Sequence, residues 1–211
     1  MRYLRQMDVV PADKLEQLSV VVVGTGAIGR QVALQLTSIG VNKIILIDFD
    51  KVEEHNLPVQ GFKESQLGKL KVEAVASDCK ELNSKLEVSA VSQKYSIDEH
   101  SIMGDVFFSC VDSIPARKEI FHSTKTKVFI DGRMSAEEMR ILTVHDPESA
   151  KTYPKTLEGT FKEAPCTAKS TIYCANVAAG VMIQQFTKWL RGMEIDKDIR
   201  FSLIGSTIFI T

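Results

Sequence analysis

The stretch VVVGTGAIGRQ, residues 21–31, constrains the fold of this chain more than any other segment. An apolar, β-branched run leads into Gly24, Gly26 and Gly29, and apolar residues at helical spacing follow until Gly40, a natural helix stop. Glycines at this spacing between a strand and a helix leave backbone N–H groups free to hold a phosphate. The sequence therefore predicts a strand–turn–helix unit with a phosphate-binding loop.

Strands and helices then alternate along the chain. Apolar runs predict strands at residues 43–48, 86–91, 105–110 and 127–132, and helical spacing predicts helices at about 72–82 and 115–123. Such alternation needs crossover connections, which place the strands in a mostly parallel sheet. We therefore predict an α/β fold with a Rossmann-like sheet flanked by helices, to which antiparallel strands are added in the C-terminal part. The length of 211 residues suits one domain over 1–211, with 1–17 as an N-terminal helical segment.

The pattern changes after residue 139. RILTVH, residues 140–145, predicts a strand, and residues 146–170 form a polar crossover without a helical or strand period. A long helix is expected over about Thr171–Arg191, and the alternating segment IRFSLIGSTIFIT at the end predicts edge strands. A polar loop as long as 146–170 inside a compact domain is unusual, and such loops usually carry function.

Composition excludes several classes of function. The net charge is -1 and no long basic stretch exists, which argues against a nucleic-acid partner. No apolar stretch is uninterrupted over the length of a membrane span, and the N-terminus lacks the pattern of a signal peptide, so we expect a cytoplasmic protein. The four cysteines lie far apart, so we expect no structural zinc site.

Charged side chains follow the predicted strands where their carboxyl ends meet. Asp48 comes nineteen residues after Gly29, a spacing that suits a carboxylate bound to ribose hydroxyls. Asp50 follows it, Lys71 opens the next helix, and Asp112 comes just after another strand. An ammonium and a carboxylate available for Mg²⁺ beside phosphate-binding glycines favour a nucleotidyl-transfer site. The glycines and Asp48 alone would serve NAD as well as ATP.

Six segments in order resemble the ThiF/MoeB-type adenylyltransferases, the family that includes the activating enzymes of ubiquitin-like proteins. They are RYLRQ, GTGAIG, DFDKVEEHNL with the following Gln60, GKLKVEA, CVDS and PCTAKS. Members of this family condense ATP with a C-terminal carboxylate, which gives an acyl-adenylate and pyrophosphate. The resemblance implies ATP and Mg²⁺ as cofactors, and a ubiquitin-like or sulfur-carrier protein ending in Gly-Gly as partner.

The resemblance also implies roles for individual residues. The nucleotide-binding set would consist of Gly24, Gly26, Gly29, Asp48, Asp50, Asn56 and Lys71. Within it Asp48 would hold the ribose, and Asn56 and Lys71 would contact the phosphates. Asp112 would bind Mg²⁺.

Arg5, in RYLRQ, resembles an arginine that reaches into the active site of a neighbouring subunit, which implies a homodimer. The sequence departs from the family pattern at Val59, where an arginine is usual. One charge that would neutralise phosphate is therefore missing, and Arg30 or Lys69 is a candidate to replace it. Arg30 is expected either to face an anion held at its helix end or to extend into water.

Cys166 lies in the polar crossover just before a helix, where the pKa of a thiol can be lowered, and is therefore a candidate nucleophile. In some relatives a cysteine of this region accepts the acyl group or sulfur. The other three cysteines, Cys79, Cys110 and Cys174, fall within apolar patterns and are expected to be structural.

Two alternative functions stay open. An NAD-binding oxidoreductase would need an acid or base near the nicotinamide; the four histidines offer no obvious candidate, and Lys71 and Asp112 would have no role. A non-catalytic scaffold subunit of a heterodimeric activating enzyme is supported by Val59, but it would not need Lys71 or Asp112. The leading hypothesis is therefore an ATP-dependent activating enzyme.

Overall fold

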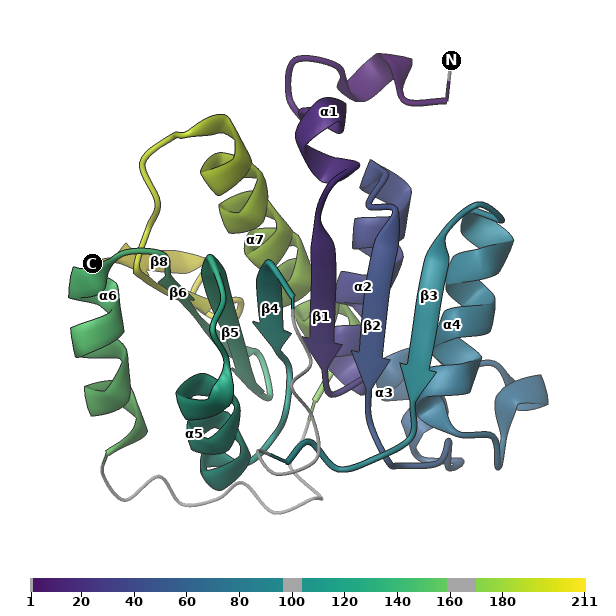
Figure 1. Cartoon of the computed structure of the whole chain (residues 1–211). Helices are drawn as coiled ribbons and strands as arrows, with labels where there is room; N and C mark the ends of the chain where they lie inside the picture. Colours follow the sequence, from purple (N-terminus) through teal and green to yellow (C-terminus); the bar gives the residue numbers. More distant parts are fainter. Residues whose placement is uncertain (1, 97–103, 159–169) are drawn as a thin grey trace.

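The computed structural model describes residues 2–96, 104–158 and 170–211, and its centre is a sheet of eight strands in the order β3-β2-β1-β4-β5-β6-β7-β8 (Figure 1). The strands are β1 Ser19–Val23, β2 Lys43–Ile47, β3 Glu87–Val91, β4 Val106–Ser109, β5 Val128–Ser135, β6 Glu138–Val144, β7 Asp198–Ser202 and β8 Thr207–Ile210. The first five strands in the sheet order pair in parallel, and β6, β7 and β8 are added antiparallel. The predicted fold class is confirmed.

Helices cover both faces of this sheet (Figure 1). One face carries α2 Ala27–Ile39, α4 Lys71–Leu82 and the long α7 Ile172–Arg191, while α5 Ile114–Ser123 and α6 Pro147–Thr152 lie on the other. The shorter helical elements are η1 Leu4–Gln6, α1 Ala12–Leu15, α3 Asn56–Gln60, η2 Glu64–Gln66 and η3 Tyr153–Leu157. No helix in the described ranges combines the length and apolar character that crossing a bilayer requires.

Strand β1 shows why the sheet is buried on both faces. Val20 and Val22 pack into the core beneath α2, α4 and α7, while Val21 and Val23 pack into a second core beneath α5 and η3. Successive side chains of a strand point to opposite faces, so a strand between two helical layers must be apolar throughout. The continuous valine run is the sequence signature of that position.

Two predicted loops contain helices. Residues 147–157, inside the predicted polar crossover, form α6 and η3, because Asp146 accepts a hydrogen bond from the Ser149 N–H at 2.7 Å and Pro147 fits the first helical position. Residues 56–60, which lie between a predicted strand and a predicted helix and are assigned to neither, form α3, which ends at Gly61 with φ +77°. Both helices are too short to show a period in the sequence.

Candidate active site

The loop between β1 and α2 can be built only with glycine at two positions. Gly24 has φ +86°, and a Cβ there would lie 2.8 Å from the carbonyl oxygen of Cys110. A Cβ on Gly29 would lie 1.8 Å from the carbonyl oxygen of Gly24. These glycines therefore let the loop fold back on itself and against the connection that follows β4.

Gly26 has a different environment. It is the N-cap of α2, and a Cβ there would meet only the Gln60 side chain, at 3.7 Å. The helix begins without a side-chain cap and without an acidic residue in its first turn. Its first N–H groups and the positive end of its dipole are therefore available to an anion.

Asp48 ties this loop to the end of β2. Its Oδ2 accepts hydrogen bonds from the Thr25 backbone N–H at 2.6 Å and from the Thr25 hydroxyl at 3.0 Å. Its Oδ1 accepts from the Asp50 N–H at 2.9 Å. An ionised carboxylate has about four lone-pair sites, so these three bonds leave room for about one more donor, such as one ribose hydroxyl.

Lys71 begins α4 and faces an acid. Its Nζ lies 3.0 Å from Oδ2 of Asp50, and its side chain is only 8% exposed, against 49% for that of Asp50. The Lys71 N–H also donates to the Asp50 carbonyl at 2.9 Å. A cation in the first turn of a helix opposes the helix dipole unless it faces an anion, and in the structure Asp50 is that anion. The pair stands at the edge of the sheet where β2 ends.

Asn56 is buried at the start of α3. Its Oδ1 accepts a hydrogen bond from the Glu53 N–H at 3.0 Å, which holds the turn between Asp50 and α3. Asn56 therefore stabilises the turn that follows β2, at the same edge of the sheet as the glycine loop. Its predicted contact with phosphate stays a prediction.

Asp112 lies in the connection between β4 and α5 and is exposed. The preceding Cys110 packs its backbone against Gly24, so this connection lies directly beside the glycine loop. The described ranges contain no cluster of three His, Cys, Asp or Glu side chains that could hold a metal ion. A single carboxylate still fits Mg²⁺, which proteins usually bind through one or two carboxylates together with substrate phosphates.

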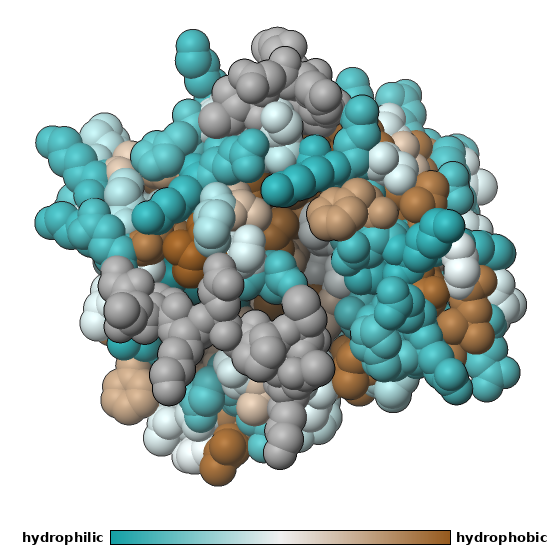
Figure 2. Space-filling model, turned by 90° about the horizontal axis from the view of Figure 1, so that it is seen from below, coloured by the Kyte–Doolittle hydropathy of each residue, from teal (hydrophilic) through white to brown (hydrophobic). Residues whose placement is uncertain are grey.

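The carboxyl ends of the parallel strands therefore bring together the glycine loop, Asp48, Asp50, Lys71 and Asp112. Figure 2 looks onto this edge and shows hydrophilic side chains on both sides of a hollow near the middle of the face. Ligands of open parallel sheets bind at this edge.

A buried charge cluster next to Asp112 was missed by the sequence analysis. The carboxylate of Asp131, at 0% exposure, accepts hydrogen bonds from Arg117, from Arg133 Nε at 2.7 Å and from the Tyr153 hydroxyl at 3.0 Å. Arg117 also donates to the carbonyl oxygen of Val111. The cluster thus fixes the connection that carries Asp112 to β5 and to η3.

A sequence signal for this cluster exists. An acid inside the apolar run VFIDG predicts a buried charge, and a buried carboxylate needs cationic or hydrogen-bonding partners. Burial strongly raises the pKa of the Tyr153 hydroxyl, and the neighbouring Asp131 carboxylate acts in the same direction, so Tyr153 is a hydrogen-bond donor here and not a base.

Arg5 lies at the opposite edge of the sheet. Gln6 donates to the carbonyl oxygen of Ile39 at 2.6 Å, and the ring of Tyr3 packs beside Gly40, both at the end of α2 that is remote from the glycine loop. A helix of this length spans roughly 20 Å. The N-terminal segment lies at that remote end (Figure 1), so Arg5 does not contact the site of its own chain.

Arg30 does not extend into water, which corrects the second of the two expectations for it. The residue is 8% exposed, and its Nη2 lies 2.8 Å from Oδ2 of Asp78 on α4. Lys69, the other candidate for the missing charge, is exposed.

The cysteines divide into two groups. Cys166 lies outside the described residues. Cys79 and Cys174 are buried in the core; burial raises the pKa of each thiol to about 11. Burial also raises the pKa of the partly buried Cys110 well above its ordinary value. These three thiols therefore stay protonated at neutral pH, which agrees with their predicted structural role.

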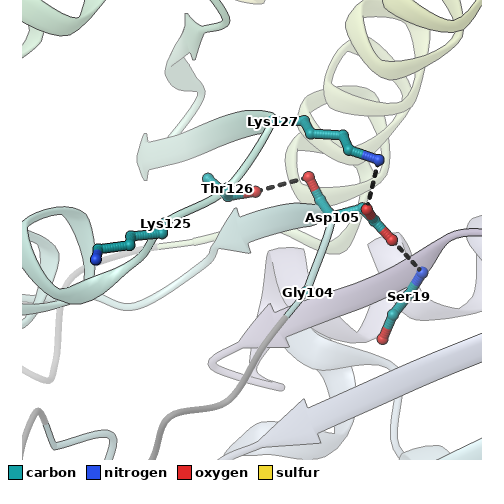
Figure 3. A pocket seen from close by; sticks show the side chains of 6 residues that line it. All are labelled: Ser19, Gly104, Asp105, Lys125, Thr126 and Lys127. Atoms are coloured by element: carbon teal, nitrogen blue, oxygen red, sulfur yellow. Dashed lines mark hydrogen bonds and ion pairs between the residues drawn. The ribbon is translucent and has the colours of Figure 1, made fainter.

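A second hollow lies at the amino ends of β1, β4 and β5, on the edge away from the glycine loop. Figure 3 shows Asp105 between Lys127, at 2.7 Å, and the Ser19 N–H, at 3.0 Å, while Lys125 points away. Its central charges satisfy one another, and it contains none of the predicted site residues.

Comparison with known proteins decides the family. The profile of the ThiF family matches residues 2–205. This chain belongs to the ThiF family. The predicted resemblance is thereby confirmed.

Individual members of the ThiF family share less of the chain. The ubiquitin-like modifier-activating enzyme 5 of Bombyx mori is 29% identical over an alignment 216 residues long, which covers 89% of this chain and 54% of that protein. The adenylyltransferase and sulfurtransferase MOCS3-1 of Zea mays is 42% identical over 76 residues, which are 36% of this chain and 16% of that protein. The chain thus spans about half the length, or less, of these curated relatives.

Solved structures share the fold. MccB of E. coli with MccA-N7isoASN superposes with a TM-score of 0.82 at 20% identity, covering 100% of this chain and 72% of MccB. MccB with ATP gives a TM-score of 0.76 at 22% identity, covering 95% and 65%. PaaA gives 0.77 at 19% identity, covering 100% and 81%.

Proposed function

We propose that this ThiF-family protein is an ATP-dependent adenylyltransferase that activates the C-terminal carboxylate of a small protein or peptide. The observation that carries the proposal is the position of the glycine loop, which Asp48 ties to β2, beside Lys71 and Asp112 at one edge of the sheet. Relatives named as activating enzymes of ubiquitin-like modifiers, and an MccB structure with ATP, support it.

The reaction joins two anions. A carboxylate oxygen of the acceptor attacks the α-phosphorus of ATP, the bond from that phosphorus to the bridging oxygen of the β-phosphate breaks, and pyrophosphate leaves with the bond electrons. No proton transfer is required at neutral pH. The main obstacle is therefore electrostatic repulsion, and the site must neutralise negative charge as it develops.

The described residues fit this demand only with added positive charge. Asp48, Asp50 and Asp112 are acids at this edge, and the cation Lys71 is already paired with Asp50. Asp112 would hold Mg²⁺ together with the triphosphate, and the ion would neutralise charge on the phosphates and pyrophosphate. The N–H groups at the start of α2 would bind phosphate oxygens, and Asp48 would accept a hydrogen bond from the ribose.

The acceptor is proposed to be a ubiquitin-like or sulfur-carrier protein, or a peptide, whose flexible tail ends in Gly-Gly. The enzyme is proposed to work as a homodimer, because Arg5 can reach a glycine loop only in another subunit. Cys166 is proposed as the residue that would take over the acyl group where transfer follows adenylation. It is not needed for the first step.

Two measurements test the proposal. MgATP at saturation should raise the melting temperature of the protein and NAD should not, because only a ligand of the folded state stabilises it. Exchange of labelled pyrophosphate into ATP should then depend on a carrier protein ending in Gly-Gly. Stabilisation by NAD alone would favour the oxidoreductase. ATP binding without exchange, with every carrier tried, would favour the scaffold subunit.

A further inference from the structure

Arg30 follows the last glycine of the loop and lies in the first turn of α2. It is 8% exposed, and its guanidinium is held between the Asp78 carboxylate, with Nη2 at 2.8 Å from Oδ2, and the ring of Phe62, 5.3 Å from its centroid. The permanent cation of Arg30 thus belongs to the helix turn whose N–H groups would bind phosphate, and its guanidinium lies between α2, α4 and Phe62.

The guanidinium is not fully used by the protein. Its Nε is buried and has no hydrogen-bond partner. Buried N–H donors without an acceptor are rare in folded proteins, and each one calls for an explanation, such as a ligand that completes it. The ion pair with Asp78 therefore does not account for all the hydrogen-bond donors of Arg30.

The end of α3 contacts both the Arg30 guanidinium and the glycine loop. A Cβ on Gly61 would lie 3.2 Å from Nη1 of Arg30, so the end of α3 rests on the guanidinium with no side chain between them. The neighbouring Gln60 packs against Gly26, and its Oε1 is also buried without a partner. Two unpartnered polar groups thus flank the start of α2 where α3 meets it.

Asp78 does not depend on Arg30 alone. It also accepts hydrogen bonds from Lys63 at 2.9 Å and from Gln66 at 3.0 Å, and Lys63 in turn lies 3.3 Å from the exposed Glu81. Arg30 and Lys63 thus share the one buried carboxylate of Asp78. Asp78 can therefore orient the Arg30 guanidinium without neutralising its whole positive charge.

We propose that Arg30 is an ATP-binding residue whose Nε and Nη1 donate to oxygens of the triphosphate, while Asp78 fixes its orientation through Nη2. The proposal rests on the proposed function and adds a cation to it. Arg30 would supply from α2 the charge that α3 does not supply, because its residue 59 is the uncharged Val59. Lys71 and Arg30 would then approach the phosphates from two different helices.

The test measures MgATP binding by calorimetry in the absence of an acceptor. Arg30→Gln should weaken MgATP binding about 10- to 100-fold, because a charge-assisted bond to phosphate is lost. Arg191→Gln, which removes the same charge at the remote end of α7, should change the affinity less than about twofold. The double variant Arg30→Gln with Val59→Arg should recover at least about fivefold, because the cation returns to the same site from α3.

The outcomes separate the two levels of the argument. If wild-type protein does not bind MgATP, the proposed function fails and this inference fails with it. If wild type binds MgATP and a folded Arg30→Gln binds it equally well, only the role of Arg30 is refuted, including the case in which its loss affects the acceptor carboxylate alone. Urea unfolding of each variant shows whether the substitution has lowered the stability of the fold. If Arg30→Gln lowers stability, recovery of binding by Val59→Arg without recovery of stability supports the proposal, and no recovery of binding overturns it.

Discussion

The substitution Gly29→Ala should lower the free energy of unfolding of the protein, although alanine is the better helix former. The Cβ that it adds would lie 1.8 Å from the carbonyl oxygen of Gly24 and 3.1 Å from Cβ of Cys110, whereas real Cβ contacts are not shorter than 3.0 Å. The atom met first is backbone, so no side-chain rotation can relieve the overlap. The loop must move away from the helix.

The magnitude follows from two opposing effects. Replacing glycine by alanine inside a helix stabilises it by about 1 kcal/mol, and overpacking a tight contact costs about 1–3 kcal/mol or more. Since a backbone segment must shift, we expect the overlap to dominate at the upper end of that range. The net loss should be about 2 kcal/mol, which lowers the melting temperature of a chain of this size by about 5 °C.

Gly26→Ala is the matched control, because its Cβ meets only the flexible Gln60 side chain, at 3.7 Å. It should leave stability without ligand within about 0.5 kcal/mol of wild type. It should nevertheless remove most of the stabilisation by MgATP, since the second glycine of such a loop lets the backbone approach the phosphates. Urea unfolding with and without MgATP measures both effects. A Gly29→Ala variant as stable as wild type would refute the reasoning about the loop.

Three further predictions follow from the site and its surroundings. Asp112→Asn should abolish pyrophosphate exchange with an unchanged urea midpoint, because the side chain is exposed; normal exchange would exclude it as the metal ligand. Burial by itself raises the pKa of Asp78, but hydrogen bonds from Lys63, Gln66 and Arg30 outweigh it and leave that pKa below 3.8, so its stabilisation is present near neutral pH and is lost as pH falls through the folded value. Wild type should therefore lose more free energy of unfolding than Asp78→Asn between about pH 5 and pH 3, and equal losses in a urea series would contradict this. The variants Arg5→Ala and Lys71→Ala should each be inactive alone. If the sites are shared, a dimer of one subunit of each variant should have about half of the wild-type activity, because one of its two sites is intact. No recovery after demonstrated subunit exchange would exclude a shared site.

The sequence predicts the parallel half of the fold because its signals are local. A buried strand such as SVVVV and the loop glycines carry their constraints within a few neighbouring residues, and the order of such units determines the sheet. The helix at 147–152 had a local signal as well, an aspartate followed by proline, but six residues are too few for a period to appear.

The charge pairs of the site could not be predicted in this way. Arg30 meets Asp78 only after α2 and α4 pack side by side, and Arg117 meets Asp131 only after α5 packs against β5. A sequence pattern shows that Arg30 and Asp131 lie in mainly apolar segments, but not which partner each of them finds. The position of Arg5 likewise depends on the direction of α2 relative to the sheet, which follows from the fold and not from RYLRQ itself.

The two hydrogen bonds from Thr25 to Asp48 would couple the ribose and the triphosphate of a nucleotide that binds here. The same carboxylate that fastens the phosphate loop would accept the ribose, so a hydroxyl that bonds to it polarises and repositions the group holding Thr25. Ribose and triphosphate would then not contribute independently to the free energy of binding. The binding free energies of inorganic triphosphate and of adenosine can be added and compared with the binding free energy of ATP. The difference should exceed the entropy gained by linking the two parts. The substitution Thr25→Val removes one of the two hydrogen bonds and should reduce this energetic coupling.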